Sequence, residues 1–264
     1  MKVYISADIE GVTGVTHWDE TEAGKSDYEA AREQMTAEVA AACEGALDAG
    51  ATEIWVKDAH DSARNIIADR LPREARLIRG WSGHPFMMMQ ELDATFKAAA
   101  LIGYHSRMGS AGNPLSHTMS GNVTWVKING EPASEFKLCA YTAALTQVPL
   151  VFVSGDRGLC DEVGQFNPNI TTLAVKEGVG NSTINLHPEA VVEQMRSGVA
   201  RGVANAGQCL LALPDHFSVE VRFRRPERAY QFGFFPGVRQ IDPCTVQLEE
   251  ADFFEVMRFF VFAL

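Results

Sequence analysis

The chain has 264 residues, with 34 acidic and 23 basic side chains, which gives a formal charge of -11 at pH 7. Hydrophobic residues make up 46% of the sequence and charged residues 22%, the composition of a globular protein with a sizeable core. Because such an acidic surface repels phosphate backbones, we expect no nucleic-acid partner.

The cysteines and the N-terminal residues indicate the cellular compartment of the protein. The five cysteines stand far apart with no C-x-x-C pair, so we expect free thiols in a reducing environment. Residues 1–5 begin as a strand rather than as a signal peptide, and no apolar run reaches the ~18 residues that span a bilayer. We therefore expect a cytoplasmic protein with no membrane partner.

Strands and helices alternate through the first half of the chain. The first helix follows a Ser26-x-x-Glu29 capping box and ends before Gly50. A polar loop at residues 106–122 precedes a hairpin, since Asn129-Gly130 suits a type I′ turn. The strands are expected at 2–7, 53–57, 98–104, 123–128 and 150–154, and the helices at 28–48, 86–96 and 134–145. Such alternation predicts an α/β fold with a mostly parallel sheet flanked by helices.

The pattern changes in the second half, after Pro214. A strand at 171–175 and a helix at 188–206 still fit the first pattern. Beyond them, alternating apolar residues from 219 to 223 predict a half-exposed strand. A helix at 226–234, a strand at 245–248 and a terminal helix at 253–264 follow. We expect a metal-binding catalytic α/β domain at 1–213 and a smaller C-terminal α+β lobe at 214–264, packed on it.

Carboxylates and imidazoles follow three of the predicted strands. Asp8 and Glu10 come at the end of the first strand, and residues two apart share one face of a strand. His60 and His105 follow the second and third strands. Ligands of open α/β sheets bind outside the carboxyl ends of the strands, so these four side chains are expected to meet in a metal site.

The ligand types indicate which metal the site would take. Mixed carboxylate and imidazole ligands favour zinc, with manganese or cobalt as substitutes. Several carboxylates also suit a bridged pair of ions ~3.5–4 Å apart that hold a hydroxide nucleophile. Taken alone, Asp8 and Glu10 are more typical of two surface acids at the start of a loop, and each histidine is more typical of a hydrogen-bonded structural residue; the matched placement at three strand ends favours the metal site. The three methionines at 87–89 are expected to pack within a helix. The alternative is that they form an apolar wall of the substrate-binding site.

These residues stand in motifs that resemble the DppA-type D-aminopeptidases, a family of bacterial zinc metallopeptidases. The opening signature of that family, Ser-x-Asp-x-Glu-Gly, is present as Ser6-Ala7-Asp8-Ile9-Glu10-Gly11. The similarity runs along almost the whole chain in the same order and weakens after about Pro214. Its other segments are Lys57-Asp58-Ala59-His60-Asp61, Gly103-Tyr104-His105-Ser106, Leu115-Ser116-His117-Thr118-Met119, residues 129–135 and Val153-Ser154-Gly155-Asp156.

The resemblance implies a dinuclear site with two Zn²⁺ per chain, in which Asp8 bridges the ions. The implied ligands are Asp8, Glu10, His60, His105 and Glu135. It also implies that His117 is catalytic, by steadying the tetrahedral intermediate or by passing a proton to the leaving amine.

The resemblance further implies the reaction and the assembly. The reaction is hydrolysis of the N-terminal, D-configured residue from short peptides such as D-alanyl peptides, by a metal-bound hydroxide. The assembly is a homo-oligomer, a decamer of two stacked pentameric rings with an internal channel.

Two other functions stay open on the residues alone. Another two-metal hydrolase would act on phosphate esters or cyclic amides, with Arg64 and Arg107 as candidates for holding phosphate. A non-catalytic protein would bind metal or peptide without hydrolysis. The sequence contains no G-x-S-x-G elbow, P-loop or G-x-G-x-x-G turn, which disfavours serine-hydrolase and nucleotide chemistry.

Overall fold

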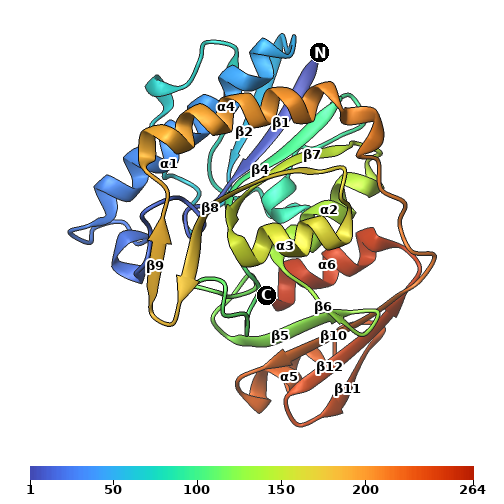
Figure 1. Ribbon diagram of the computed structural model, residues 1–264. Helices are drawn as coiled ribbons and strands as arrows, with labels where there is room; N and C mark the ends of the chain where they lie inside the picture. The colour runs from blue at the N-terminus through green and yellow to red at the C-terminus, as the bar shows by residue number, and fades with distance from the viewer.

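A seven-stranded sheet forms the centre of the molecule in the computed structural model, which describes residues 1–264 (Figure 1). The strand order is β3-β2-β1-β4-β7-β8-β9, and every neighbouring pair is parallel except β8 and β9. The strands are β1 (Lys2–Ala7), β2 (Glu53–Asp58), β3 (Ala75–Ile78), β4 (Ala98–Tyr104), β7 (Leu150–Asp156), β8 (Thr171–Val179) and β9 (Ser182–Asn185). Strands β4 and β7 are buried throughout, as strands covered by helices on both faces must be.

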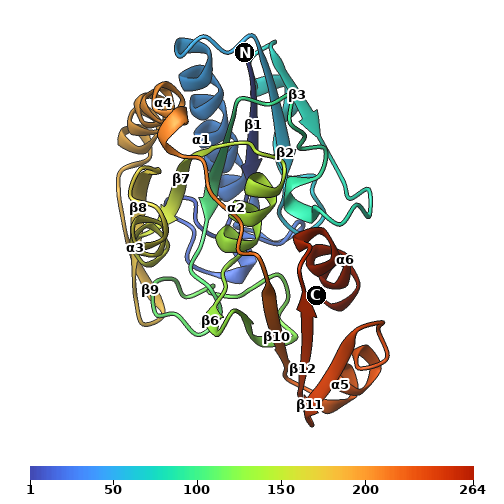
Figure 2. The same cartoon turned by 90° about the vertical axis from the view of Figure 1, so that its right-hand side faces the viewer.

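Helices cover both faces of this sheet. Helices α1 (Tyr28–Asp48) and α4 (Pro188–Ala204) pack on each other and share one apolar core with β1 (Figure 2). Helices α2 (Glu135–Leu145) and α3 (Arg157–Phe166) contribute to a second core on the opposite face. The predicted α/β fold with a mostly parallel, helix-flanked sheet is therefore confirmed. None of the helices combines the length and the apolar character needed to cross a membrane.

A second, antiparallel sheet of five strands lies at the lower end of the molecule in Figure 1, in the order β11-β12-β10-β5-β6. Its strands are β5 (Val123–Ile128), β6 (Glu131–Pro132), β10 (Phe217–Phe223), β11 (Val238–Asp242) and β12 (Thr245–Glu250), and it carries α5 (Pro226–Phe232) and α6 (Phe253–Ala263). Residues of β10 alternate between buried and half-buried, as predicted. The sheet takes β5 and β6 from one side of the expected 213/214 boundary and its other strands from the other side. That boundary between domains stays a prediction.

Local turn chemistry agrees with the sequence at the hairpin of β5 and β6. Asn129 and Gly130 have φ values of 54° and 81°, the left-handed pair that a type I′ turn requires. The five cysteines are free, as expected, and four of them are buried.

Two local predictions were wrong. Residues 86–96 form only the short 3-10 helix η3 (Met87–Met89), because Met87 and Glu91 have φ values of 48° and 68°, which no α-helix accommodates. The capping box is absent as well: α1 starts after Asp27, and the Ser26 hydroxyl donates to the Asp27 carboxylate rather than accepting from a helix N–H. The other 3-10 helices are η1 (Trp18–Glu20), η2 (Ala68–Arg70) and η4 (Ala206–Gln208). Four further elements, β3, α3, β9 and β11, were not predicted from the sequence.

Candidate metal centre

The ends of three adjacent strands bring the first predicted ligands together. Strand β1 lies between β2 and β4 and is parallel to both, so the residues that follow these strands leave the sheet at one edge. Gly103, in β4, has a φ of 68°, and a Cβ there would lie 2.4 Å from the Asp8 carbonyl oxygen. Gly11 N donates to the Gly103 carbonyl oxygen at 2.8 Å. The turn that carries Asp8 and Glu10 can therefore cross the end of β4 only because a glycine is there.

His60 faces two carboxylates with one ring nitrogen and a carbonyl with the other. Its Nε2 lies 2.9 Å from the Thr21 carbonyl oxygen, so Nε2 carries a proton and donates it. Its Nδ1 lies 3.2 Å from Asp8 Oδ1 and 3.0 Å from Glu10 Oε2. In a neutral ring the Nδ1 lone pair points at both carboxylates, an arrangement that is stable only with a cation between them.

His105 has the same arrangement on the other side of Asp8. Its Nδ1 donates to the Ser106 carbonyl oxygen at 2.9 Å. Its Nε2 lies 3.6 Å from Asp8 Oδ2 and 3.4 Å from Glu135 Oε2. Both His105 Nε2 and Glu10 Oε2 are buried without a hydrogen-bond partner. Since an unpartnered buried polar atom is costly, these atoms fit a bound metal ion.

Glu135 and His117 come from outside the strand ends. Glu135 is the first residue of α2, which Ser134 caps by accepting from Lys137 N at 3.2 Å. Glu135 Oε1 accepts from Met119 N at 2.6 Å. His117, in the loop of residues 106–122, donates from Nδ1 to the Leu115 carbonyl oxygen at 2.9 Å.

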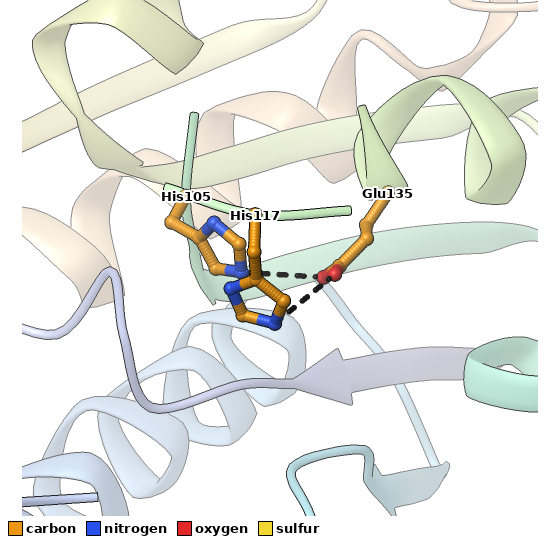
Figure 3. Close-up of side chains that lie close together, drawn as sticks. All are labelled: His105, His117 and Glu135. Atoms are coloured by element: carbon orange, nitrogen blue, oxygen red, sulfur yellow. Dashed lines mark ion pairs between the residues drawn. The ribbon is translucent and has the colours of Figure 1, made fainter. Parts of the chain in front are cut away.

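The side chain of His117 converges with those of His105 and Glu135 (Figure 3). Its Nε2 lies 3.6 Å from Glu135 Oε1, and its ring stacks on that of His105 with centroids 4.4 Å apart. These three residues offer ligand atoms within 4.8 Å of one another, and so do Asp8, Glu10 and His105. The structure thus gathers the five predicted ligands and His117 around one point. Their individual roles stay predictions.

The electrostatics of the cluster are those of a site with excess negative charge. Burial, reinforced by the charge of Glu10, raises the pKa of Asp8 well above its usual range. Burial opposes the charging of His105, but the neighbouring Glu135 carboxylate overcomes this and raises the pKa of His105 to about 10. The same holds for His60, whose pKa is raised well above its usual value by Glu10 in spite of burial. Three carboxylates thus attract positive charge so strongly that both imidazoles hold protons when no metal is bound, and a divalent cation would replace those protons.

A cavity of about 490 Å³ opens beside the cluster. Its walls include Asp8, Glu10, His60, His117 and Glu135, together with the aromatic and methionine side chains of Trp18, Trp81, Met87, Met88 and Met119. No lysine or arginine lines it. Arg107 lines a separate cavity and Arg64 lines neither, so neither of the two arginines considered as phosphate ligands lines the cavity beside the cluster.

Asp156 supports the cluster, although the sequence suggested no role for it. Its Oδ2 accepts from Ser106 N at 2.7 Å, and its Oδ1 accepts from Ser106 Oγ and from Leu159 N. Ser106 in turn supplies the carbonyl that orients His105. Asp156 ends β7, at the same edge of the sheet as the ligands, and that position was the signal that could have identified it.

The chain is similar to known proteins along almost its whole length. A D-aminopeptidase of Bacillus subtilis (strain 168) is 33% identical over 258 residues, which cover 97% of this chain and 93% of that protein. The solved structure of the Zn-dependent D-aminopeptidase DppA from Bacillus subtilis, described as a self-compartmentalizing protease, superposes with a TM-score of 0.93 at 31% identity and covers 100% of this chain and 96% of that one. The model of the peptidase M55 family, the D-aminopeptidases, matches residues 1–262. The chain therefore belongs to the M55 family of D-aminopeptidases.

Proposed function

We propose that the metal centre of this metallopeptidase holds two zinc ions and that the enzyme removes the N-terminal, D-configured residue from short peptides such as D-alanyl peptides. One observation carries the proposal: three buried carboxylates and two buried imidazoles face one another beside a single cavity, with nitrogen–oxygen distances of 3.0–3.6 Å. The names of the relatives support the metal and the handedness, since both are D-aminopeptidases and one is zinc-dependent.

Asp8 is the proposed bridge between the two ions. Its Oδ1 faces His60 Nδ1, and its Oδ2 faces His105 Nε2. Glu10 lies on the His60 side, and Glu135 lies on the His105 side. The five residues therefore divide into two ligand groups that share Asp8, which supports a count of two ions rather than one.

His117 is the proposed catalytic residue. Zinc in such a site polarises a carbonyl group and lowers the pKa of a water molecule to ~7, which supplies a nucleophile at neutral pH. The Leu115 carbonyl fixes the proton of His117 on Nδ1, which leaves Nε2 to exchange a proton with a substrate in the cavity that His117 lines. From there it can steady the tetrahedral intermediate or protonate the leaving amine.

We also infer a cytoplasmic homo-oligomer, a decamer of two stacked pentameric rings. Support comes from the self-compartmentalizing relative and from large apolar side chains on the surface of the isolated chain. Phe234 is 73% exposed, and Phe262 and Ile184 are each 65% exposed. Large exposed apolar side chains of this kind are available for burial in contacts between subunits. Light scattering coupled to gel filtration tests the assembly, and a monomer at micromolar concentration would contradict it.

Metal analysis combined with cleavage assays tests the function. Zinc-loaded protein should retain two ions per chain and cleave D-alanyl dipeptides faster than L-alanyl dipeptides. Retention of fewer than one ion per chain would contradict the proposed centre, and faster cleavage of the L-series would overturn the handedness alone. Turnover only of a phosphate ester would replace the peptidase with another two-metal hydrolase, and binding without any turnover would indicate a binding protein.

A further inference from the structure

Trp81 presents a rigidly held aromatic ring to the cavity beside the metal centre. The residue is 44% exposed and lines that cavity. Its indole Nε1 donates to the carbonyl oxygen of Asp61 at 2.7 Å, and Asp61 directly follows the proposed ligand His60. The indole position is thus tied to the loop that carries a ligand.

A buried lysine holds the same ring from one face. Lys57 is fully buried, its Nζ lies 3.9 Å from the centroid of the Trp81 ring, and it donates to the Gly80 carbonyl oxygen at 2.7 Å. Burial of an ammonium group is costly, and here burial lowers the pKa of Lys57 to about 8. A cation–π contact offsets part of that cost and restricts the ring. Neither Lys57 nor Trp81 has a part in the proposed mechanism. The contact between them is therefore a candidate for a role in substrate binding.

Eight apolar side chains line the cavity around Trp81. Apart from the proposed ligands and His117, its polar lining residues are Thr21, Glu22, Asp61, His84 and Gln90. Trp18, which is 42% exposed, has its ring 5.5 Å from that of His117. Met87, Met88 and Met119 also line the cavity. Tryptophan and methionine offer large, polarisable contact surfaces, which exceed what the methyl group of an alanine residue could cover.

We propose that Trp81, braced by Lys57, contacts the side chain of the N-terminal residue of the substrate and makes the enzyme prefer a large apolar or aromatic residue there over alanine. This inference rests on the proposed aminopeptidase function and adds the class of side chain that the site accepts. Lys57 acts as a positioning residue, because it reaches the substrate only through the ring that it holds.

Matched peptides that differ only in the N-terminal residue test the preference. The zinc-loaded enzyme should show a kcat/KM for phenylalanyl peptides at least about tenfold above that for alanyl peptides of the same handedness, since a single methylene group in an apolar pocket is worth tenfold or more. Trp81→Ala should lower this ratio about tenfold or more, and Lys57→Met should lower it in the same direction through KM rather than kcat. Lys57→Arg, which keeps the cation, should retain part of the ratio.

Trp125→Ala is the matched control. Trp125 also makes a cation–π contact, since Lys127 Nζ lies 4.5 Å from the centroid of its ring, but Trp125 does not line the cavity. This variant should leave the ratio unchanged. Equal kcat/KM for the two peptides in the unmodified enzyme, or an unchanged ratio in Trp81→Ala, would overturn the inference while the aminopeptidase function stood. Absence of all cleavage would instead contradict the proposed function. In that case calorimetric titration with phenylalaninamide and alaninamide decides the role of Trp81, since equal binding to the unmodified protein and to Trp81→Ala would overturn it.

Discussion

The two halves of the metal centre are built differently. Asp8, Glu10, His60 and His105 follow strands that pair side by side, so the hydrogen-bond ladder of the sheet fixes where their backbones leave it. Glu135 starts a helix, and His117 lies in the long loop of residues 106–122. The first half is positioned by regular structure and the second by a few specific contacts.

Those specific contacts make the second half adjustable. Glu135 receives its hydrogen bond from Met119 N, and Met119 has a φ of 62°, a left-handed conformation that a non-glycine residue adopts only when its surroundings impose it. The position of His117 depends on the same loop. We infer that the four strand-end residues determine whether metal is held, with Glu135 completing the ligand set, and that His117 determines how fast the enzyme works.

Glu10→Gln should have the largest effect. The amide keeps the shape of the side chain but removes the charge beside His60. Zinc affinity should therefore fall by more than about 100-fold, because loss of a ligand should weaken binding more than loss of a group that only supports a ligand. Zinc retained during dialysis against a graded chelator measures the loss, and activity should fall with it. Glu131→Gln is the control, since Glu131 is exposed and outside the cavity. Unchanged zinc retention would remove Glu10 from the centre.

His117→Ala should reduce kcat by about 10²–10⁴-fold, the usual contribution of a general acid or base, with zinc content unchanged. Metal analysis and steady-state kinetics on the same preparation separate the two quantities. His216→Ala serves as the control, because His216 pairs with Glu249 at the surface, away from the cavity. If zinc is lost together with activity, His117 is a ligand and the two halves of the centre do not divide as proposed.

Asp156→Asn should weaken zinc binding by about 10–100-fold, the effect of removing a group that orients a ligand. The amide can no longer accept hydrogen bonds from Ser106 with both oxygens, so the carbonyl that orients His105 loses its support. The same chelator titration measures the change. Asp161→Asn, at an exposed position of helix α3, which Asp156 caps, should have no effect. An equal loss in both variants would attribute the effect to α3 and not to His105.

Glu38→Gln should have the smallest effect, on stability rather than on chemistry. Glu38 Oε1 accepts from Thr13 N at 3.1 Å, three residues after Glu10, and burial raises the pKa of Glu38 from 4.5 to about 7. Because the folded state favours the neutral carboxyl group, the stability from this group is fully present below pH 4.5 and is lost as the pH rises through about 7.

The difference between Glu38→Gln and the unmodified protein isolates this contribution. The free energy of unfolding of the variant, relative to the unmodified protein, should improve by about 2–3 kcal/mol between pH 4.5 and pH 8. Urea unfolding of the zinc-loaded proteins at several pH values measures it. Glu33→Gln, at an exposed position on the same helix, should show no such trend. A difference that stays constant with pH would show that Glu38 is charged in the folded protein.

The sequence predicted the elements whose signal is local. The hairpin at Asn129-Gly130 and the strand ends at Asp8, His60 and His105 were found because turn chemistry and apolar runs are properties of neighbouring residues. The helix expected at 86–96 was wrong for the opposite reason. Its apolar spacing resembles a helix, but the chain folds into a 3-10 turn of which Met87 and Met88 line the cavity and Met89 is buried in the core.

The sequence by itself determined that this is an acidic α/β protein with carboxylates and imidazoles at one edge of a parallel sheet, because strand periodicity and parallel pairing bring these residues to one place. Family motifs, rather than spacing, pointed to Glu135 and His117. Only the tertiary structure decided that both face the strand-end ligands, that Asp156 supports His105, and that a lysine lies beneath Trp81. Each of these depends on contacts between segments far apart in the chain, such as those of Glu135 with Met119 and of Ser106 with Asp156, and no local pattern records them.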